Sequence, residues 1–417
     1  MTEVELTIER PAPGGRMIAR HEGRVVFVAG AIPGERVRAR LERPRGGTLF
    51  ATAVEVIESS PDRRDPGADP ACGGRDFAHI ALARQHALKA EIVVDAFRRL
   101  ARLPLDGPPV VHASPEDGWR MRARLHVAGG QVGFYREGTH DICDAGCSRQ
   151  LRHDTMAVVQ DIGGRLGRLG PAARGSLEIA ENRDASQRVA LLDVAVDALP
   201  AQAADDLLDV GGATGVGLAL RGRLVAERGS PVVLDVIDIG HATVRLRRHV
   251  RGFFQGNRFL LGELMERVLA HVPEGPVLDL YAGVGLFGLA HAALGRGPVM
   301  AVEGDATSAA DLTANAAPFG GAVEAVEASV ESIVSKPSAL TGRTVIVDPP
   351  RTGLSQAVTQ ALAAARPPHI VYVSCDVATL ARDVGRLTTV GYSTRQVEAF
   401  DLFPGTSHVE TLVHLAR

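Results

Sequence analysis

The sequence is poor in cysteine and almost free of lysine. It contains four cysteines and one tryptophan in 417 residues, and of its 46 basic residues only Lys89 and Lys336 are lysines. Four widely spaced cysteines do not make the disulfide framework of a small secreted protein, so we expect them to serve in packing, metal binding or nucleophilic chemistry. A GC-rich genome explains the preference for arginine more simply than selection for phosphate binding does.

The sequence also lacks a long apolar run and an excess of positive charge. No stretch approaches the roughly 20 apolar residues that span a bilayer, and the beginning, MTEVELTIERP, is acidic where a signal peptide would be basic. We therefore expect a cytoplasmic protein without a membrane partner. The net charge of −3 excludes a protein that holds nucleic acid by bulk electrostatics alone, so any RNA would meet local basic stripes.

Three segments with different patterns predict a multidomain protein. Hydrophobic residues make up 45% of the chain, which suffices for a core in each segment. Residues 1–58 alternate short apolar runs with turns, which predicts a small OB-like β-barrel. Within it, RVRAR places Arg36, Arg38 and Arg40 on one strand face. That face suits a nucleic-acid backbone, although a solvated outer face would show the same pattern.

Residues 59–250 form the second segment. It opens with SSPDRRDPGADPACGG, whose Pro, Gly and Asp residues indicate a linker. An amphipathic helix is predicted over about 77–103, ending at Pro104. The remainder is mostly strand-like and predicts a central β-rich RNA-binding domain. In it, the stretch WRMRARLHV again places arginines on one strand face, namely Arg120, Arg122 and Arg124.

Residues 251–417 alternate strands, glycine turns and helices. The apolar runs PVLDLY, PVMAVE, TVIVDPP and IVYVSC are separated by helical patterns, which predicts a Rossmann-like α/β domain with a parallel sheet wrapped by helices. In VLDLYAGVGLFGLAHA, Gly283 and Gly285 allow a tight turn close to a ligand, and the next strand ends at Glu303. An acid at that place can accept hydrogen bonds from both ribose hydroxyls of a bound nucleoside.

A second acidic signature, VDPPRTGL, ends another strand. Methyltransferases of this sheet type place substrate beside the S-adenosylmethionine sulfonium at the position of Asp348. Those that methylate amino nitrogens commonly have an aromatic residue after the two prolines, whereas this chain has Arg351. An ordinary strand-ending turn is the alternative, and the glycine turn upstream argues against it.

Cys375 in VSCDVATLARD lies between a short apolar run and a predicted helix. The carboxyl end of a sheet strand is where open α/β sheets bind ligands, and a helix N-terminus stabilises a thiolate. A cysteine that only fills space is the alternative. Near the end of the chain, DLFPGTSHVETL adds His408 and Glu410 just before the last strand.

These residues together describe methylation of carbon 5 of uracil. That carbon is a poor nucleophile until a thiolate adds at carbon 6, and a base must then remove the proton that remains on carbon 5. The reaction needs a cysteine, a carboxylate or histidine base, and a methyl donor.

The chain resembles the RNA (uracil-C5)-methyltransferase family over nearly its whole length. DPPRTG, SCDVATLARD, FPGTSHVE and FFQGN (Phe253–Asn257) match the family segments in order and spacing. The resemblance implies S-adenosylmethionine as cofactor, Cys375 as nucleophile and Glu410 as proton acceptor. The cofactor-binding residues that it implies are Gln255, Tyr281, Glu303 and Asp348.

The first 58 residues resemble a TRAM domain, an RNA-binding module, through GGRMIAR, VVFVAGAIPGE and the basic strand. This resemblance favours a structured ribosomal RNA, 23S, over a transfer RNA as substrate. In the family, the helix predicted at about 77–103 packs on the catalytic domain. We expect a monomer.

One departure from the family concerns an iron–sulfur cluster. Many members that carry a TRAM domain hold one with C-x5-C-G-G-C and a fourth cysteine downstream. Here those places are Pro66, Cys72, Arg75 and Cys147, with Cys143 as an additional cysteine. A cluster normally takes four thiolates, so we predict that no iron–sulfur cluster is bound.

Three other functions stay open at this stage. They are a tRNA uracil-C5 methyltransferase, an RNA cytosine-C5 methyltransferase, and an RNA-binding protein with an inactive catalytic domain. The cytosine enzymes of the RNA class carry a cysteine directly after the proline, where this chain has Arg351. Failure to bind S-adenosylmethionine would favour the inactive protein.

Overall fold

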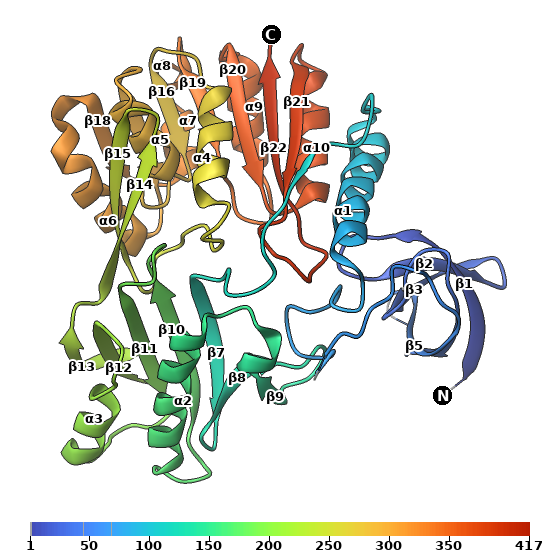
Figure 1. Cartoon of the computed structure of the whole chain (residues 1–417). Coiled ribbons are helices and arrows are strands. Elements are labelled where there is room, and N and C mark those ends of the chain that lie inside the picture. The colour runs from blue at the N-terminus through green and yellow to red at the C-terminus, as the bar shows by residue number, and fades with distance from the viewer. Residues whose placement is uncertain (1, 45, 68) are drawn as a thin grey trace.

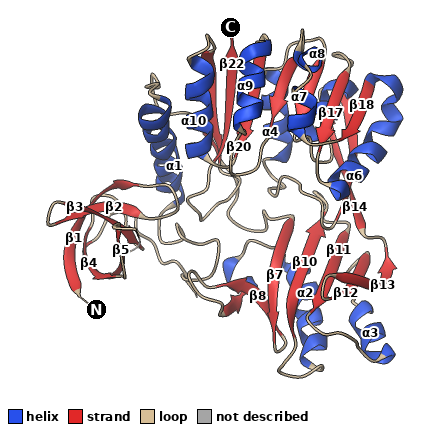
Figure 2. Ribbon diagram, turned by 180° about the vertical axis from the view of Figure 1, so that it is seen from behind, coloured by secondary structure: helices blue, strands red, loops and turns tan. Residues whose placement is uncertain are grey.

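A computed structural model describes residues 2–44, 46–67 and 69–417. The chain runs from a small barrel through a linker and one long helix into a central sheet, and ends in a larger α/β domain (Figure 1). Seen from behind, the long helix lies between the barrel and the α/β domain, and the central sheet lies below that domain (Figure 2). The order of parts agrees with the predicted multidomain architecture.

The N-terminal barrel is closed, with strand order β1-β2-β3-β5-β4 and β4 paired back to β1. Alternate residues such as Leu6, Ile8 and Val37 point inward and are at most 2% exposed, because successive side chains of a strand face opposite sides. The strands are β1 (Glu3–Pro11), β2 (Met17–His21), β3 (Arg24–Ala29), β4 (Arg36–Leu41) and β5 (Leu49–Glu58). The predicted barrel is therefore confirmed.

The arginines of β4 lie on the outer face of the barrel, and each meets an acid on a neighbouring strand. The ion pairs are Arg36 with Glu58 at 2.7 Å, Arg38 with Glu55 at 2.5 Å and Arg40 with Glu3 at 3.5 Å. Exposed pairs of this kind contribute little to stability. They do compensate the positive charge on which an RNA-binding role for this face depends, so that role stays a prediction.

Helix α1 (Leu82–Ala96) continues through a π-helical turn, Phe97–Ala101. The sequence predicted a start near residue 77, which is wrong because Phe77 lies in a turn before the helix and Ile80 forms an isolated β-bridge with Arg63. The helix has two apolar faces. Leu88 and Ile92 pack with the barrel core, whereas Val93, Ala96 and Phe97 pack in a core of the C-terminal domain.

The central domain is built on a seven-stranded sheet of order β13-β12-β11-β10-β7-β8-β9. Two helices, which the sequence did not predict, contribute Val159, Ile162 and Leu207 to its core. The strands are β7 (Arg122–Ala128), β8 (Gln131–Tyr135), β9 (Ile142–Asp144), β10 (Arg174–Glu181), β11 (Arg188–Val194), β12 (Gly215–Leu220) and β13 (Arg223–Gly229), and the helices are α2 (His153–Gly167) and α3 (Ala201–Leu208).

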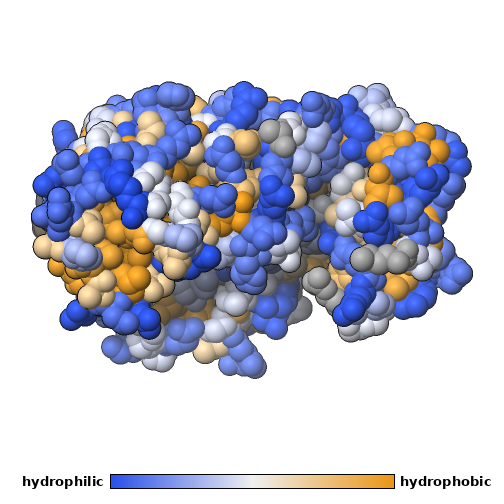
Figure 3. All heavy atoms as spheres, turned by 90° about the horizontal axis from the view of Figure 1, so that it is seen from below, coloured by the Kyte–Doolittle hydropathy of each residue, from blue (hydrophilic) through white to orange (hydrophobic). Residues whose placement is uncertain are grey.

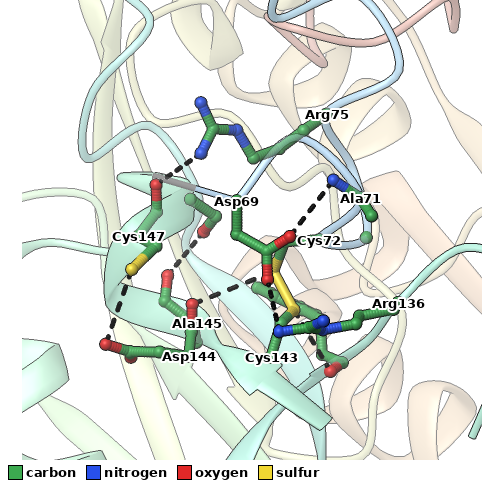
Figure 4. Close-up of a disulfide and its surroundings, with 12 residues drawn as sticks. Asp69, Ala71, Cys72, Arg75, Arg136, Cys143, Asp144, Ala145 and Cys147 are labelled. Atoms are coloured by element: carbon green, nitrogen blue, oxygen red, sulfur yellow. Dashed lines mark hydrogen bonds and ion pairs between the residues drawn. A yellow bond between two sulfur atoms is a disulfide. The ribbon is translucent and has the colours of Figure 1, made fainter. Parts of the chain in front are cut away.

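A disulfide joins Cys72 of the linker to Cys143 of β9, with their Cα atoms 5.6 Å apart (Figure 4). The sequence predicted packing, metal binding or nucleophilic chemistry for the cysteines, and for these two that prediction is wrong. Cys72 and Cys143 are 71 residues apart in sequence, so only the packing of the linker against β9 brings them together. Cys147 and Cys375 are free thiols.

The hairpin β14 (Val232–Ile239) and β15 (Ala242–His249) follows the central sheet and forms a separate two-stranded sheet. Its apolar side chains Ile237, Val244 and Leu246 share a core with helices of the C-terminal domain. A domain boundary at residue 250 therefore separates this hairpin from residues with which it packs, and that boundary stays a proposal.

The C-terminal domain has an eight-stranded sheet of order β18-β17-β16-β19-β20-β22-β21-β6. The first five strands in this order are parallel, and β22 runs antiparallel to β20 and β21. The strands are β16 (Val277–Leu280), β17 (Val299–Glu303), β18 (Val323–Glu327), β19 (Thr344–Val347), β20 (His369–Ser374), β21 (Ser393–Phe400), β22 (Glu410–Ala416) and β6 (Val111–His112), which joins from the segment after α1.

Helices cover both faces of this sheet (Figures 1 and 2). They are α4 (Leu261–Ala270), α5 (Leu286–Ala293), α6 (Ala306–Ala316), α7 (Val330–Val334), α8 (Pro337–Leu340), α9 (Gln356–Ala365) and α10 (Val377–Thr388). Residues 345–347 of β19 and 370–373 of β20 are fully buried, as expected for a parallel sheet covered on both sides.

The surface is mainly hydrophilic when seen from below, with apolar patches on the two lobes that the central domain and the barrel form (Figure 3). Within the part of the chain that the structure describes, no helix is long and apolar enough to cross a membrane.

Candidate active site

A cavity of about 690 Å³ opens at the carboxyl ends of the parallel strands, where the C-terminal domain faces the central domain. Open α/β sheets bind ligands at this edge because strand ends and helix N-termini converge there. All six residues that the sequence assigned to the site line this one cavity: Gln255, Tyr281, Glu303, Asp348, Cys375 and Glu410.

The glycine turn after β16 forms the floor of the site. Tyr281, Gly283 and Gly285 have φ values of 61°, 58° and 99°, so the chain turns sharply between strand and helix. A Cβ at Gly285 would lie 2.5 Å from Leu289, which requires glycine, whereas one at Gly283 would meet only a carbonyl oxygen at 3.9 Å. The backbone at Gly283 is thus open to a ligand.

Asp279 of β16 stabilises the segment that follows this turn. It is 1% exposed, and its Oδ2 accepts a hydrogen bond from the Gly288 N–H at 2.9 Å. Its Oδ1 has no hydrogen-bond partner within the described residues. Burial raises the pKa of Asp279 to about 7, against the lowering effect of the Gly288 N–H.

Glu303, the last residue of β17, is turned toward the glycine turn. Its two carboxylate oxygens accept hydrogen bonds from the N–H of Gly283 at 2.8 Å and from the N–H of Asp305 at 2.7 Å. Backbone donors therefore fix the carboxylate at the cavity wall, where it can accept hydrogen bonds from ribose hydroxyls.

Gln255 and Asp348 meet across the cavity. The Gln255 Nε2 donates to Asp348 Oδ2 at 2.9 Å, and Gln255 is 6% exposed. Burial, opposed by the hydrogen bond from Gln255 and assisted by the charge of Glu303, raises the pKa of Asp348 to about 7. The site therefore concentrates negative charge that a bound cation would relieve.

Cys375 follows β20 directly and precedes Asp376, the N-cap of α10. The expectation that the helix N-terminus would stabilise its thiolate is not met. Burial, Glu410 and Asp348 raise the pKa of the Cys375 thiol to about 12, while Arg351 lowers it. The Asp376 side chain itself accepts the Thr379 N–H at 2.8 Å, so a carboxylate already occupies the helix terminus.

Glu410 begins β22, and the antiparallel pairing of β22 with β20 places it beside the end of that strand, since Ser374 pairs with Thr411. It is 2% exposed, and its Oε1 has no hydrogen-bond partner among the described residues. Burial and Asp348 raise the pKa of Glu410 well above its usual value, and Arg351 opposes this.

His408, the other acid–base residue of this segment, does not line the cavity. Its ring packs edge-on against Phe403 at 5.9 Å between centroids. Burial, followed by the charge of Arg351, lowers the pKa of His408. Of the two candidates for a base, the structure therefore places only Glu410 in the cavity with Cys375.

The sequence did not assign a role to Arg351, which lines the cavity and lowers the pKa of both Cys375 and Glu410. It was noted only as a departure from the aromatic residue of amino-nitrogen methyltransferases and from the cysteine of cytosine enzymes, although its place directly after the two prolines indicates a position beside the substrate. The cavity is lined by further residues that the sequence left unassigned, among them Trp119, which is buried, and Phe253, which is 60% exposed.

Comparisons with known proteins agree with this geometry. The family model "tRNA (Uracil-5-)-methyltransferase" matches residues 330–417, and the TRAM domain model matches residues 2–54. The 23S rRNA (uracil(1939)-C(5))-methyltransferase RlmD of Halomonas elongata is 32% identical over 438 residues, covering 99% of this chain and 89% of that protein. An uncharacterized RNA methyltransferase of Streptomyces avermitilis is 31% identical over 99% of this chain and 98% of its own length.

Among solved structures, the Pyrococcus abyssi tRNA (uracil-54, C5)-methyltransferase in complex with S-adenosyl-L-homocysteine superposes with a TM-score of 0.78. The match covers 99% of this chain and 100% of that chain at 22% sequence identity. This likeness shows the same arrangement of barrel, central sheet and α/β domain.

Proposed function

We propose a mechanism for this chain, which belongs to the RNA (uracil-C5)-methyltransferase family, whose members use S-adenosylmethionine. We propose that it methylates carbon 5 of a uridine in structured RNA through a covalent bond from Cys375 to carbon 6. The observation that supports this most directly is that Cys375 and Glu410 line the same cavity as Glu303 and Asp348.

The residues of the cavity fit S-adenosylmethionine. Glu303 presents a carboxylate fixed by two backbone N–H groups, and the backbone at Gly283 leaves room for a ligand. Gln255, Tyr281, Glu303 and Asp348 would hold the cofactor, which supplies an electrophilic methyl group when bound. The raised pKa of Asp348 fits a carboxylate that is poised to meet a positive group.

The proposed steps use one thiol and one carboxyl group. Cys375 loses its thiol proton to solvent, its sulfur adds to carbon 6, and carbon 5 becomes nucleophilic enough to be methylated. Glu410 then takes the proton from carbon 5, the bond between sulfur and carbon 6 breaks, the double bond re-forms, and the released thiolate takes a proton back from solvent. Glu410 finally passes the proton to solvent, so that the net products are a methylated uridine, the demethylated cofactor and one proton.

Arg351 supports both ionisations. A positive charge beside a buried thiol and a buried carboxyl favours their charged forms, which is the direction of its effect on Cys375 and Glu410. Without it, burial and the two acids would raise the pKa of the Cys375 thiol further. We infer that Arg351 is a positioning and charge-balancing residue of the reaction.

Denaturing gels with methyl-labelled cofactor test the covalent step. Glu410→Gln should add to the base and methylate it once but fail to release it, so a slow RNA–protein band should accumulate. Cys375→Ser should give no band and no turnover, because a hydroxyl adds poorly to carbon 6 and is not ionised at neutral pH. His408→Gln is the matched control and should turn over without accumulating the band.

Two results would contradict this assignment. One is the absence of the band from Glu410→Gln while that variant still binds RNA, which would leave His408 as the next candidate base. The other is turnover by Cys375→Ser. The target base must leave its stack to reach the cavity, which costs a few kcal/mol and least in a loop, so the substrate should be a hairpin.

We propose ribosomal RNA as the substrate, because relatives that match almost the whole chain are named 23S rRNA methyltransferases. Mapping 5-methyluridine in total RNA from a strain without the protein should reveal one lost position in 23S rRNA. Loss of a position in transfer RNA instead would favour the alternative substrate.

A further inference from the structure

Four positions of this chain correspond to the cluster-binding cysteines of TRAM-bearing relatives, namely Pro66, Cys72, Arg75 and Cys147, and they lie close together in this protein. The guanidinium of Arg75 donates to the carbonyl oxygens of Pro66 and of Cys147, the latter at 2.7 Å. Cys72 is bonded to Cys143 instead of facing an open site (Figure 4). A cluster normally takes four thiolates, and two of them are missing here while an arginine lies among the remaining residues. These residues therefore do not fit an iron–sulfur cluster.

The Cys72–Cys143 disulfide fastens the linker to the central sheet. Both sulfur-bearing residues are 2% exposed. Beside the bond, the Gly73 N–H donates to the Tyr135 carbonyl at 3.1 Å, and the Gly73 carbonyl accepts from Gln150 Nε2 at 3.1 Å. The linker is thus held at Cys72 and Gly73 by one covalent and two polar contacts.

Just after Cys72 and Gly73, the linker contacts residues 401–409, which we call the active-site loop. The Asp76 Oδ2 accepts the Ser407 N–H at 2.9 Å, and the Phe77 N–H donates to the Gly405 carbonyl at 2.9 Å. Only three residues separate Cys72 from Asp76. Because so short a segment cannot absorb much movement, a displacement of Cys72 should also displace the active-site loop.

The active-site loop in turn shapes the cavity. Phe403 lines the cavity and packs edge-on against Trp119 at 5.9 Å between ring centroids. Glu410 follows the loop directly and begins β22. The position of the loop therefore sets where the ring of Phe403 and the start of β22 lie relative to Cys375.

We propose that the Cys72–Cys143 disulfide is a two-electron redox site that positions the active-site loop through residues 73–77. Oxidised protein holds the loop in place. Reduction frees the linker, loosens the loop and slows methylation. Only the activity readout rests on the proposed function, because loop mobility can be measured without substrate.

A small dithiol is the class of reductant that this site requires. One dithiol gives two electrons and two protons, the sulfur–sulfur bond breaks, Cys72 and Cys143 become thiols, and the dithiol closes into its own cyclic disulfide. Cys147 is a poor internal competitor, because burial and the neighbouring Asp144 raise the pKa of its thiol and only thiolates attack disulfides. The buried sulfurs should react slowly with monothiols.

Hydrogen exchange with mass spectrometry gives the structural test. Oxidised wild-type protein is compared with protein reduced by dithiothreitol and with Cys72→Ala/Cys143→Ala, and Cys147→Ala serves as the matched control. We expect exchange in residues 401–409 to rise about tenfold on reduction or in the double variant. Cys147→Ala should match wild type. A free-thiol count of four in protein purified without reductant would overturn the proposal.

Methylation rates give the functional test. We expect kcat to fall about tenfold in the reduced and double-variant proteins, since small misplacements at a reacting centre are costly, while KM for S-adenosylmethionine stays within about twofold. Unchanged kcat together with unchanged loop exchange would overturn the positioning role. If oxidised wild type methylates no RNA, the proposed function fails, but the exchange result still decides whether the disulfide holds the loop.

Discussion

Arg351 balances the charge of the cavity, in which Glu303, Asp348 and Glu410 all carry carboxyl groups. Because Arg351 lowers the pKa of the Cys375 thiol, its removal should raise that pKa further. The thiolate forms as the pH rises, so the rate should increase with pH in wild type, and the same increase should occur at higher pH in Arg351→Gln.

Single-turnover rates measured between pH 6 and 10 check this prediction. Each unit by which the thiol pKa rises should lower the rate at a fixed pH below that pKa by about tenfold. Arg366→Gln, an exposed arginine at the end of α9, is the control and should keep the wild-type profile. Because the pKa of the Cys375 thiol, about 12, lies above this range, both rates should still be rising at pH 10, and equal rates for Arg351→Gln and wild type at every pH would contradict this role of Arg351.

Asp279 makes the stability of the protein depend on pH. Its pKa is raised to about 7 from an ordinary value of 3.8. A raised pKa means that the folded state binds the proton more tightly, so this contribution to stability is complete below about pH 4 and is lost as the pH rises through 7. Asp279→Asn removes that loss while keeping an acceptor for the Gly288 N–H.

Urea unfolding at pH 5 and pH 8 measures the effect. We compare the free energy of unfolding of Asp279→Asn with that of wild type at each pH. This difference should favour the variant more at pH 8 than at pH 5, by on the order of a few kcal/mol. Glu324→Gln, at an exposed position of β18, should show the same difference at both pH values. A constant offset for Asp279→Asn would contradict the raised pKa.

At the scale of elements, helix α1 holds the active-site loop through a buried ion pair. Lys89 is fully buried, pairs with Asp401, and donates to the Phe403 carbonyl at 3.1 Å. Burial lowers the pKa of Lys89, and Asp401 opposes this. Removing one partner of such a pair leaves the other charge buried, which typically costs about 3–5 kcal/mol.

A double-mutant cycle tests this contact. Lys89→Met should destabilise the protein by about 3–5 kcal/mol, and Lys89→Met/Asp401→Asn should recover a large part of that loss, because no buried charge then remains unpaired. Unfolding by urea gives the four free energies. Additive effects of the two substitutions would mean that the pair does not couple the helix to the loop.

The helix itself shows how an element can be predicted in kind but misplaced in extent. Its apolar positions predicted one amphipathic face, yet Leu88 and Val93 belong to two different cores. Phe77 and Ile80 fit the helical spacing but lie before the helix, in a turn and in an isolated β-bridge, where both pack in the barrel core. Periodicity cannot distinguish a residue within a helix from one that packs beside it.

At the level of the whole molecule, Arg38 and Arg124, one from each arginine stripe, differ in their ion pairing. Arg38 of the barrel lies 2.5 Å from Glu55. Arg124 of the central sheet is exposed on β7 and makes no ion pair within the described ranges of the chain. A phosphate must compete with a carboxylate for the first but not for the second.

We therefore expect Arg124→Gln to weaken RNA binding more than Arg38→Gln does. Loss of one phosphate contact should reduce the slope of log affinity against log salt by about one unit for Arg124→Gln and by less for Arg38→Gln. Binding of S-adenosylmethionine should not change, since neither residue lines the cavity. Filter binding at several salt concentrations measures the slopes, and equal slopes in both variants would contradict the argument.

Local patterns in the sequence predicted the layout of the protein, and its resemblance to a family predicted the residues of the candidate site. A barrel, a β-rich middle and a parallel α/β domain follow from local patterns, because strand alternation and strand–turn–helix order are written within short stretches. The site residues Tyr281, Glu303, Asp348 and Cys375 each stand at or just after the end of a parallel strand, and parallel strand ends meet at one edge of a sheet.

Only the tertiary structure decided how those residues behave. The Cys375 thiol resists ionisation because it is buried and because Glu410 comes close to it on an antiparallel last strand, a direction that the sequence does not specify. Cys72 and Cys143 pair because the linker packs on β9, and Arg351 gains its role from acids that come from other strands. Ionisation and disulfide pairing depend on neighbours distant along the chain, and those neighbours exist only once the chain has folded.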